Sequence, residues 1–305
     1  MLRVKIAKPT GFCFGVERAI RLARQGLKKY GRVWTLGELV HNPQVMRELK
    51  AEGIRPLRHK KDLQHGALVI RAHGCPKMIF DHCRQLGIPV IDATCPYVKR
   101  VQNVARQLTD DGYQVVVVGE KNHPEVKAIL SAAGRRAGVI SPQTGGPWNW
   151  LLKTGVRKIG VVAQTTMDKE GFKAVVARLL NFGYNELRVF DTICAEVTAR
   201  QEATVRLAQA VDAVIVVGGK NSANTTRLAQ LVRATGRPVI HIAEPAELKP
   251  GIWRRFGTRV PTQRIQRVGI AAGASTPAQV VQEIARRLKN AGCAAAISNE
   301  ATTEF

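Results

Sequence analysis

Short apolar runs alternate along this chain with longer amphipathic segments. Strand-like runs lie at 32–36, 114–118 and 213–217, and the last two consist almost entirely of Val, Ile and Ala, as parallel strands buried on both faces do. In the segments before the first two runs, apolar residues recur three and four positions apart, which predicts helices. Strands that alternate with helices in this way predict an α/β protein with parallel sheets.

One unit of this pattern occurs three times. In each copy a cysteine is followed 24 residues later by a glycine, and a helical segment and a strand lie between the two. The helical pattern is clear in the first two copies and weak in the third. Such spacing predicts three repeated α/β units, because chance does not reproduce the same offsets three times. The pairs are Cys13 and Gly37, Cys95 and Gly119, and Cys194 and Gly218.

The repeats also place polar residues where strands end. Further strands at 68–73, 160–166 and 269–275 end in polar residues, and those at 89–95 and 187–194 lead into the next cysteine. Residues 4–13 supply the strand and cysteine that the third copy lacks, which predicts that the repeats close on themselves. The predicted units are 1–96, 97–193 and 194–289, followed by a C-terminal tail, 290–305.

Composition narrows the possible functions. The 305 residues contain six cysteines, too few for a disulfide scaffold, and neither a membrane-length apolar run nor an apolar signal core, so we expect a cytoplasmic protein without a membrane partner. The net charge of +24 suits nucleic acid, anionic substrates or an acidic protein partner. Only 5% of residues are aromatic and no nucleic-acid motif is present, so nucleic acid is the least expected of these.

Three cysteines at equivalent places suggest a shared metal centre. Cys13, Cys95 and Cys194 each begin a predicted helix, where a positive helix end lowers the pKa of a thiol. Threefold arrangement would bring them together, and three thiolates suit iron–sulfur chemistry. A [4Fe–4S] cluster with three cysteine ligands has one iron open to a substrate oxygen. Cys75, Cys83 and Cys293 fall outside the repeat; Cys83 and Cys293 are interpreted as ordinary thiols, and Cys75, one residue beyond "HG", as a bystander near the site.

The polar residues at the strand ends suit an anion. Histidine, hydroxyl and amide groups that converge on one point can hold a diphosphate, and no nucleotide-binding glycine loop is present. Glu125 is the one carboxylate that the repeat aims inward, and an anionic ligand and a cluster beside it should raise its pKa and make it a proton donor. The other groups are His41, His73, His123, Thr165, Ser222, Asn224 and Ser275.

These segments resemble the LytB/IspH family of 4-hydroxy-3-methylbut-2-enyl diphosphate reductases. The resemblance covers residues 4 to about 285 and rests on motifs in the family's order. The motifs are "GFCFGVERAI", "ELVHNPQV", "RAHG", "DATCPYVK", "NHPEV", "QTTMD", "DTIC" with "RQEA", "GGKNSANTTRL" and "AGASTP".

The resemblance implies the last step of the non-mevalonate isoprenoid pathway, a two-electron reduction that gives isopentenyl and dimethylallyl diphosphates. It implies a trefoil of three α/β units around a central [4Fe–4S] cluster, with ferredoxin or flavodoxin as electron donor. It further implies Cys13, Cys95 and Cys194 as ligands, Glu125 as proton donor and Thr165 as the residue that positions it and the substrate hydroxyl. The implied diphosphate pocket is His41, His73, His123, Ser222, Asn224 and Ser275.

Two positions depart from the family pattern, and two rival functions remain. Ala223 stands where members often have serine, which removes one hydroxyl, and Cys75 stands where members usually have another residue. The rivals are a basic nucleic-acid-binding protein and an aconitase-type hydro-lyase, which has an open iron but needs no external electrons.

Overall fold

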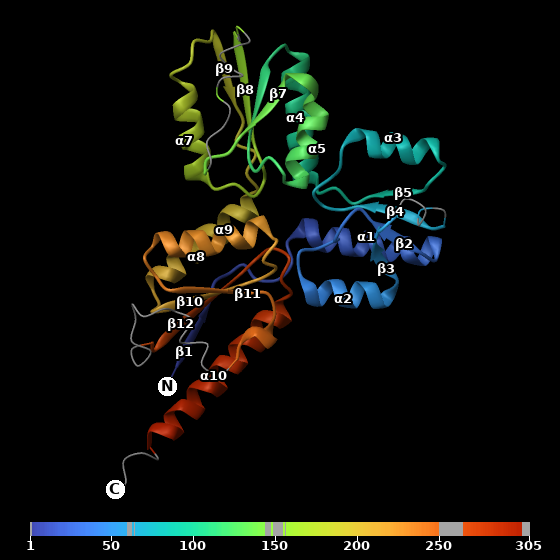
Figure 1. The fold of residues 1–305 in the computed structure, drawn as a ribbon. Coiled ribbons are helices and arrows are strands. Elements are labelled where there is room, and N and C mark those ends of the chain that lie inside the picture. Colours follow the sequence, from blue (N-terminus) through green and yellow to red (C-terminus); the bar gives the residue numbers. More distant parts are fainter. Residues whose placement is uncertain are drawn as a thin grey trace. The chain divides into compact units, whose positions relative to one another are not determined.

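The computed structural model of the protein describes residues 2–59, 63, 65–143, 148, 155, 157–249 and 265–300, with side chains as far as residue 290. Its strands form three four-stranded sheets, and every pair of neighbouring strands is parallel (Figure 1). The prediction of three α/β units with parallel sheets is therefore confirmed. The chain divides into two compact units: Met1–Cys13 with Val40–Arg47 and Glu196–Phe305, and Phe14–Leu39 with Glu48–Ala195.

The first unit contains one sheet with helices on both faces. Leu207 of α8 and Leu228 of α9 pack against one face, and Ile284 of α10 packs against the other. The N-terminal strand β1 pairs with β12, so it completes the third copy of the repeat, as the sequence predicts. The strand order is β1-β12-β10-β11, with β1 Arg3–Ile6, α8 Ala195–Gln209, β10 Ala213–Val217, α9 Ala223–Ala234, β11 Val239–Ile242, β12 Arg267–Ala272 and α10 Ala278–Glu300.

The second unit contains the other two sheets. In the earlier one, α1 packs on the strands from one side, and Phe80 of α3 joins the cluster around Leu68 and Ile70. The strand order is β3-β2-β4-β5, with α1 Phe14–Tyr30, β2 Val33–Thr35, β3 Ile54–Pro56, β4 Ala67–Ile70, α3 Lys77–Gln85 and β5 Val90–Asp92. Helix α2, Pro43–Glu52, belongs to the first unit as far as Arg47 and to the second unit from Glu48.

The later sheet of the second unit has the same order of equivalent strands. Val101 of α4 and Ile129 of α5 pack on one face, and Phe172 of α7 packs on the other. The strand order is β7-β6-β8-β9, with α4 Pro96–Asp110, β6 Gln114–Val118, α5 Pro124–Ala133, β7 Ala137–Ile140, β8 Lys158–Ala163, α7 Lys169–Leu179 and β9 Glu186–Val189.

Three strands and the end of the last helix go beyond the sequence prediction. β3, β7 and β11 are edge strands of three or four residues that each follow a helix, and none of them is among the strands predicted from the sequence. α10 extends to Glu300, inside the segment assigned to a tail, whereas residues 301–305 lie outside the described residues. Among the described helices, none is both long and apolar enough to span a membrane.

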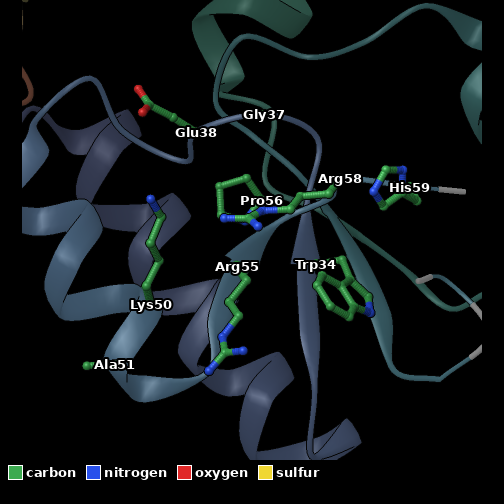
Figure 2. Close-up of a pocket in the computed structure, with 9 residues that line it drawn as sticks. All are labelled: Trp34, Gly37, Glu38, Lys50, Ala51, Arg55, Pro56, Arg58 and His59. Atoms are coloured by element: carbon green, nitrogen blue, oxygen red, sulfur yellow. The ribbon is translucent and has the colours of Figure 1, made fainter. Parts of the chain in front are cut away.

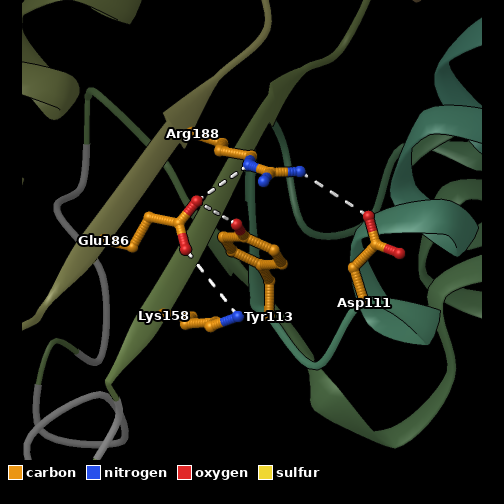
Figure 3. A network of polar contacts seen from close by, with 5 residues as sticks. All are labelled: Asp111, Tyr113, Lys158, Glu186 and Arg188. Carbon is orange, nitrogen blue, oxygen red and sulfur yellow. Dashed lines mark hydrogen bonds and ion pairs between the residues drawn. The ribbon is translucent and has the colours of Figure 1, made fainter.

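A polar network lies at the amino ends of β6, β8 and β9 (Figure 3). The Tyr113 hydroxyl donates a hydrogen bond to Glu186, and the Arg188 Nε donates another to the same carboxylate at 3.0 Å. The cations of Lys158 and Arg188 lie 5.4 and 4.9 Å from the centre of the Tyr113 ring. These contacts tie three strands together at the edge opposite the strand ends that carry the predicted site residues.

Glu186→Gln should therefore make stability less dependent on pH in the acid range. The Tyr113 hydroxyl, followed by Arg188, lowers the pKa of Glu186, so this carboxylate stabilises the fold above its ordinary pKa of 4.5 and ceases to do so as the pH falls. Urea unfolding should show the variant less stable than wild type at pH 7, with a difference that shrinks toward pH 3. Glu170→Gln, at an exposed ion pair, is the control and should match wild type; a constant deficit for Glu186→Gln would contradict this role.

Candidate functional site

In the first unit, the turns that follow β10 and β12 hold the segment that carries His41. The Gly219 amide donates a hydrogen bond to the His41 carbonyl oxygen at 3.1 Å, and the Ser275 hydroxyl approaches the same oxygen at 3.3 Å. The Cys13 amide donates to the carbonyl of Ala274 at 2.9 Å. Three of the predicted residues, Cys13, His41 and Ser275, are thus fixed to one edge of this sheet, at the carboxyl ends of its strands.

Helix α9 adds two further predicted residues to this edge. Ser222 is the N-cap residue, and its hydroxyl accepts a hydrogen bond from the Thr225 amide at 3.3 Å. Asn224 follows in the first turn and is 5% exposed, yet neither its amide nitrogen nor its amide oxygen has a hydrogen-bond partner among the described residues. A buried amide without partners is costly, so Asn224 fits a site where a ligand supplies the missing bonds.

In the second unit, Glu125 and Thr165 form a buried pair. The Thr165 amide donates to one Glu125 carboxylate oxygen at 2.6 Å, and the Thr165 hydroxyl donates to the other at 2.8 Å. Glu125 is 1% exposed, and this burial raises its pKa to about 7, although both bonds from Thr165 act to lower it. Thr166 instead accepts a hydrogen bond from Gln164, so Thr165 is the residue that touches the carboxylate.

The two predicted histidines of the second unit lie beside this pair. His123 is the N-cap residue of α5, and its Nδ1 accepts a hydrogen bond from the Glu125 amide at 3.2 Å. The His73 and His123 rings meet edge to face, with centres 5.3 Å apart. The turn before α5 therefore positions a histidine pair and the buried carboxyl together.

Cys95 and Cys194 also lie in this part of the second unit. The Cys95 amide donates to the Ala72 carbonyl at 2.9 Å, and the Cys194 amide donates to the Thr165 carbonyl at 3.0 Å. Burial raises the pKa of the Cys95 thiol, which the negative charges of Cys194 and Glu125 raise further. The amides at the start of α4 oppose this shift but do not outweigh it, so the predicted lowering of a thiol pKa is wrong for metal-free Cys95.

The donor set fits an iron–sulfur cluster in its chemistry. Cys13, Cys95 and Cys194 are partly exposed thiols outside any disulfide, and each directly precedes a helix. Within the described part of the chain, no three His, Cys, Asp or Glu side chains are grouped as they would be around a metal ion. Cys13 belongs to the first compact unit, and Cys95 and Cys194 belong to the second.

The cysteines outside the repeat belong to the protein interior where the structure describes them. Cys75 and Cys83 are 7% and 1% exposed and pack in one apolar cluster with Leu68 and Ile70. Burial raises the pKa of Cys75 to about 12, which makes it a poor nucleophile and metal ligand. The Cys293 side chain lies outside the described residues.

A hollow in the second unit is not the predicted site. It has a volume of about 850 Å³ and lies beside the carboxyl ends of β2 and β3 (Figure 2). Four of the nine residues that line it are Lys, Arg or His, and none is a predicted site residue: Trp34, Gly37, Glu38, Lys50, Ala51, Arg55, Pro56, Arg58 and His59. A second hollow of about 500 Å³ is lined in part by Cys75 and Gln102.

Comparison with known proteins assigns this chain to a family. The sequence model of the LytB protein family matches residues 4–289. The chain belongs to the LytB family. It is similar to two 4-hydroxy-3-methylbut-2-enyl diphosphate reductases: that of Aquifex aeolicus (strain VF5), 40% identical over 95% of this chain and 96% of that one, and that of Pelobacter propionicus, 39% identical over 94% and 98%.

Two solved structures share the fold. A structure of (E)-4-hydroxy-3-methyl-but-2-enyl diphosphate reductase, described as the terminal enzyme of the non-mevalonate pathway, matches 95% of this chain with a TM-score of 0.67 and 39% identity. A second, the E-1-hydroxy-2-methyl-but-2-enyl-4-diphosphate reductase from Plasmodium falciparum, matches 94% with a TM-score of 0.82 and 26% identity.

Gly219 is a residue of this LytB chain that sequence reasoning missed. A methyl group on its Cα would overlap the carbonyl oxygen of His41, the group to which the Gly219 amide donates. The signal in the sequence was the doubled glycine "GGKN", present in one copy of the repeat only. Gly219 therefore allows the close approach of two backbones that fixes His41.

Gly219→Ala should raise KM for a diphosphate substrate by about 10- to 100-fold, because the His41 segment must move to admit the new methyl group. Steady-state kinetics with anaerobically purified protein measures this effect. Gly183→Ala is the matched control, since the added methyl group there meets no atom within 4 Å. Unchanged KM for Gly219→Ala would show that the His41 position is not set by this contact.

Proposed function

We propose that this chain is a 4-hydroxy-3-methylbut-2-enyl diphosphate reductase that forms isopentenyl and dimethylallyl diphosphates. The reaction takes up two electrons and two protons, breaks the bond between carbon and the hydroxyl oxygen, and releases water. Support comes from relatives of that activity that match nearly the whole length of the chain. The observation that carries the proposal is the buried Glu125–Thr165 pair beside Cys95 and Cys194.

We assign one [4Fe–4S] cluster to Cys13, Cys95 and Cys194, with one iron open, in a trefoil of the units 1–96, 97–193 and 194–289. Soft thiolate donors at three helix starts support this assignment. When bound, the cluster would supply the electrons and a Lewis-acidic iron.

Diphosphate binding is assigned to the polar residues at the strand ends. Asn224, whose amide is buried without partners, and the adjacent N-terminus of α9 suit phosphate oxygens. The Ala223 amide can donate there, so the missing serine hydroxyl costs about 1 kcal/mol of binding. The other proposed contacts are His41, His73, His123, Ser222 and Ser275.

Glu125 is assigned the proton. A carboxyl whose pKa is about 7 holds a proton at neutral pH and can release it, which is the requirement for a general acid. The Thr165 hydroxyl, 2.8 Å from that carboxyl, orients it and can pass a proton to the leaving hydroxyl group. Burial of both residues keeps bulk water from this proton.

An anaerobic assay with (E)-4-hydroxy-3-methylbut-2-enyl diphosphate tests this function. Both C5 diphosphates should form only when a chemical reductant is present, and the protein should absorb broadly near about 400 nm. Product without reductant would favour a hydro-lyase. Iron-free protein that binds nucleic acid and forms no product would favour the other rival.

The electron donor should be a small acidic protein, ferredoxin or flavodoxin, met in the cytoplasm. A net charge of +24 attracts an acidic partner at long range, and salt screens this attraction. The apparent second-order rate with the protein donor should fall at least about tenfold between 0.05 and 0.5 M salt. A neutral chemical reductant is the control. Equal salt dependence for the two reductants would contradict electrostatic docking.

A further inference from the structure

The segment "RQEA" begins with an arginine, Arg200, that lies inside the first unit. Its side chain is 2% exposed although it sits on helix α8, where a charged residue would ordinarily face water. Buried charges need partners, so the contacts of Arg200 indicate what it does.

The Arg200 guanidinium bonds to the loop that carries Cys13. One terminal nitrogen donates to the Pro9 carbonyl at 3.1 Å, and the other donates to the Gly11 carbonyl at 3.0 Å. The second nitrogen also pairs with Glu196 at 2.9 Å, one helical turn earlier on α8. A guanidinium presents several donors in a rigid plane, so one arginine can fix two carbonyls that a lysine could not hold together.

The conformation of the loop between β1 and Cys13 is held by a few hydrogen bonds. It is tied at its start by the Ala7 amide, which donates to the Ile270 carbonyl, and at its end by the Cys13 amide, which donates to the Ala274 carbonyl, both at 2.9 Å. Gly11, between them, has a φ of +86°. The carbonyls of Pro9 and Gly11 lie in the span between these ties, and Arg200 fastens both.

A second arginine–glutamate pair on α8 shows that the four-residue spacing alone does not explain the burial of Arg200. Arg206 and Glu202 also stand four residues apart on α8, but their side chains are 68% and 59% exposed and 3.8 Å from each other. That pair is a surface ion pair of small energetic effect. Arg200 differs because it faces inward and bonds to backbone carbonyls 191 and 189 residues away in the sequence.

We propose that Arg200 is a positioning residue for the Cys13 thiolate. It fixes the backbone of residues 9–11 and thereby the orientation of the Cys13 side chain. The inference rests on the proposed function, in which Cys13 is a cluster ligand. Since α8 begins at Ala195, directly after Cys194, the helix that follows one proposed ligand fastens the loop of another.

Hydrogen exchange and iron retention of Arg200→Lys test the proposal. Lysine keeps the charge but cannot reach both carbonyls, so amides of residues 7–13 should exchange at least about tenfold faster in metal-free protein, while those of 213–217 stay unchanged. Loaded protein should lose iron to a chelator about 10- to 100-fold faster than wild type, as when a partner that orients a ligand is removed. Arg206→Lys is the matched control and should behave as wild type.

A second variant covers the case in which Arg200→Lys does not fold. Glu196→Gln leaves the arginine but removes its carboxylate partner, and exchange of residues 7–13 should rise about threefold. Unchanged exchange and iron loss in the variants that fold would overturn the proposal. Faster exchange, with iron absent from wild type as well, would support the anchoring and contradict the cluster of the proposed function.

Discussion

Glu125→Gln should lower turnover at least about a hundredfold while the iron content and the fold stay those of wild type. Gln can still accept the hydrogen bond from the Thr165 amide, but it has no acidic proton to give. The assay is the reductant-dependent formation of C5 diphosphates by protein of equal iron content. Glu120→Gln, at an exposed residue on the same turn, is the control and should retain full activity. Near-normal turnover of Glu125→Gln would remove Glu125 from the mechanism.

The same variant should reveal the buried carboxyl through stability. The pKa of Glu125 is about 7 in the fold against an ordinary 4.5, so the folded state binds this proton more tightly than the unfolded state does. Its contribution to stability is present in full below pH 4.5 and is lost as the pH rises to about 7, by on the order of 3 kcal/mol. Metal-free wild type should lose this stability relative to Glu125→Gln in urea titrations across that range. Parallel pH profiles would show that Glu125 is not held protonated.

Replacement of any one of Cys13, Cys95 and Cys194 by alanine should reduce bound iron from about four per chain to less than about one and abolish turnover. Each proposed ligand binds one iron of the cluster, and the two cysteines that remain in a variant are too few to hold it. Iron analysis and visible absorption of anaerobically purified protein measure the loss.

Cys75→Ala is the control for these three variants, because Cys75 packs in an apolar cluster and its pKa is about 12. It should keep its iron. Full iron in one of the three variants would exclude that cysteine as a ligand, and loss of iron in Cys75→Ala would give that residue a role that its burial does not suggest.

The repeat made most of the fold predictable from sequence. The 24-residue offset identified the equivalent strands of the three copies. It also assigned the strand before Cys13 to the third copy, and in the structure β1 pairs with β12 of that copy. The edge strands β3 and β11 were not predicted. β3, with "IRP", is too short to show the alternation that marks a half-buried strand, whereas "VIHI" in β11 is largely apolar and was missed.

Contacts made by the backbone could not be predicted from residue types. Arg200 lies on the buried face of α8, where a charged residue interrupts the apolar pattern of the helix. The sequence cannot distinguish a buried arginine from a surface arginine, because the difference lies in its partners. Gly219 and the Glu125–Thr165 bonds likewise depend on which turns meet in space. Sequence identified the chemical groups of the candidate site, and the structure supplied the neighbours that set their pKa and orientation.

Mössbauer spectroscopy of ⁵⁷Fe-enriched, anaerobically purified protein, recorded with and without (E)-4-hydroxy-3-methylbut-2-enyl diphosphate, tests the central claim most directly. Three cysteine ligands on a [4Fe–4S] cluster predict that about a quarter of the iron gives its own signal, and that the substrate changes that signal alone. Four equivalent irons that do not respond to the substrate, or a protein without iron, would contradict the claim.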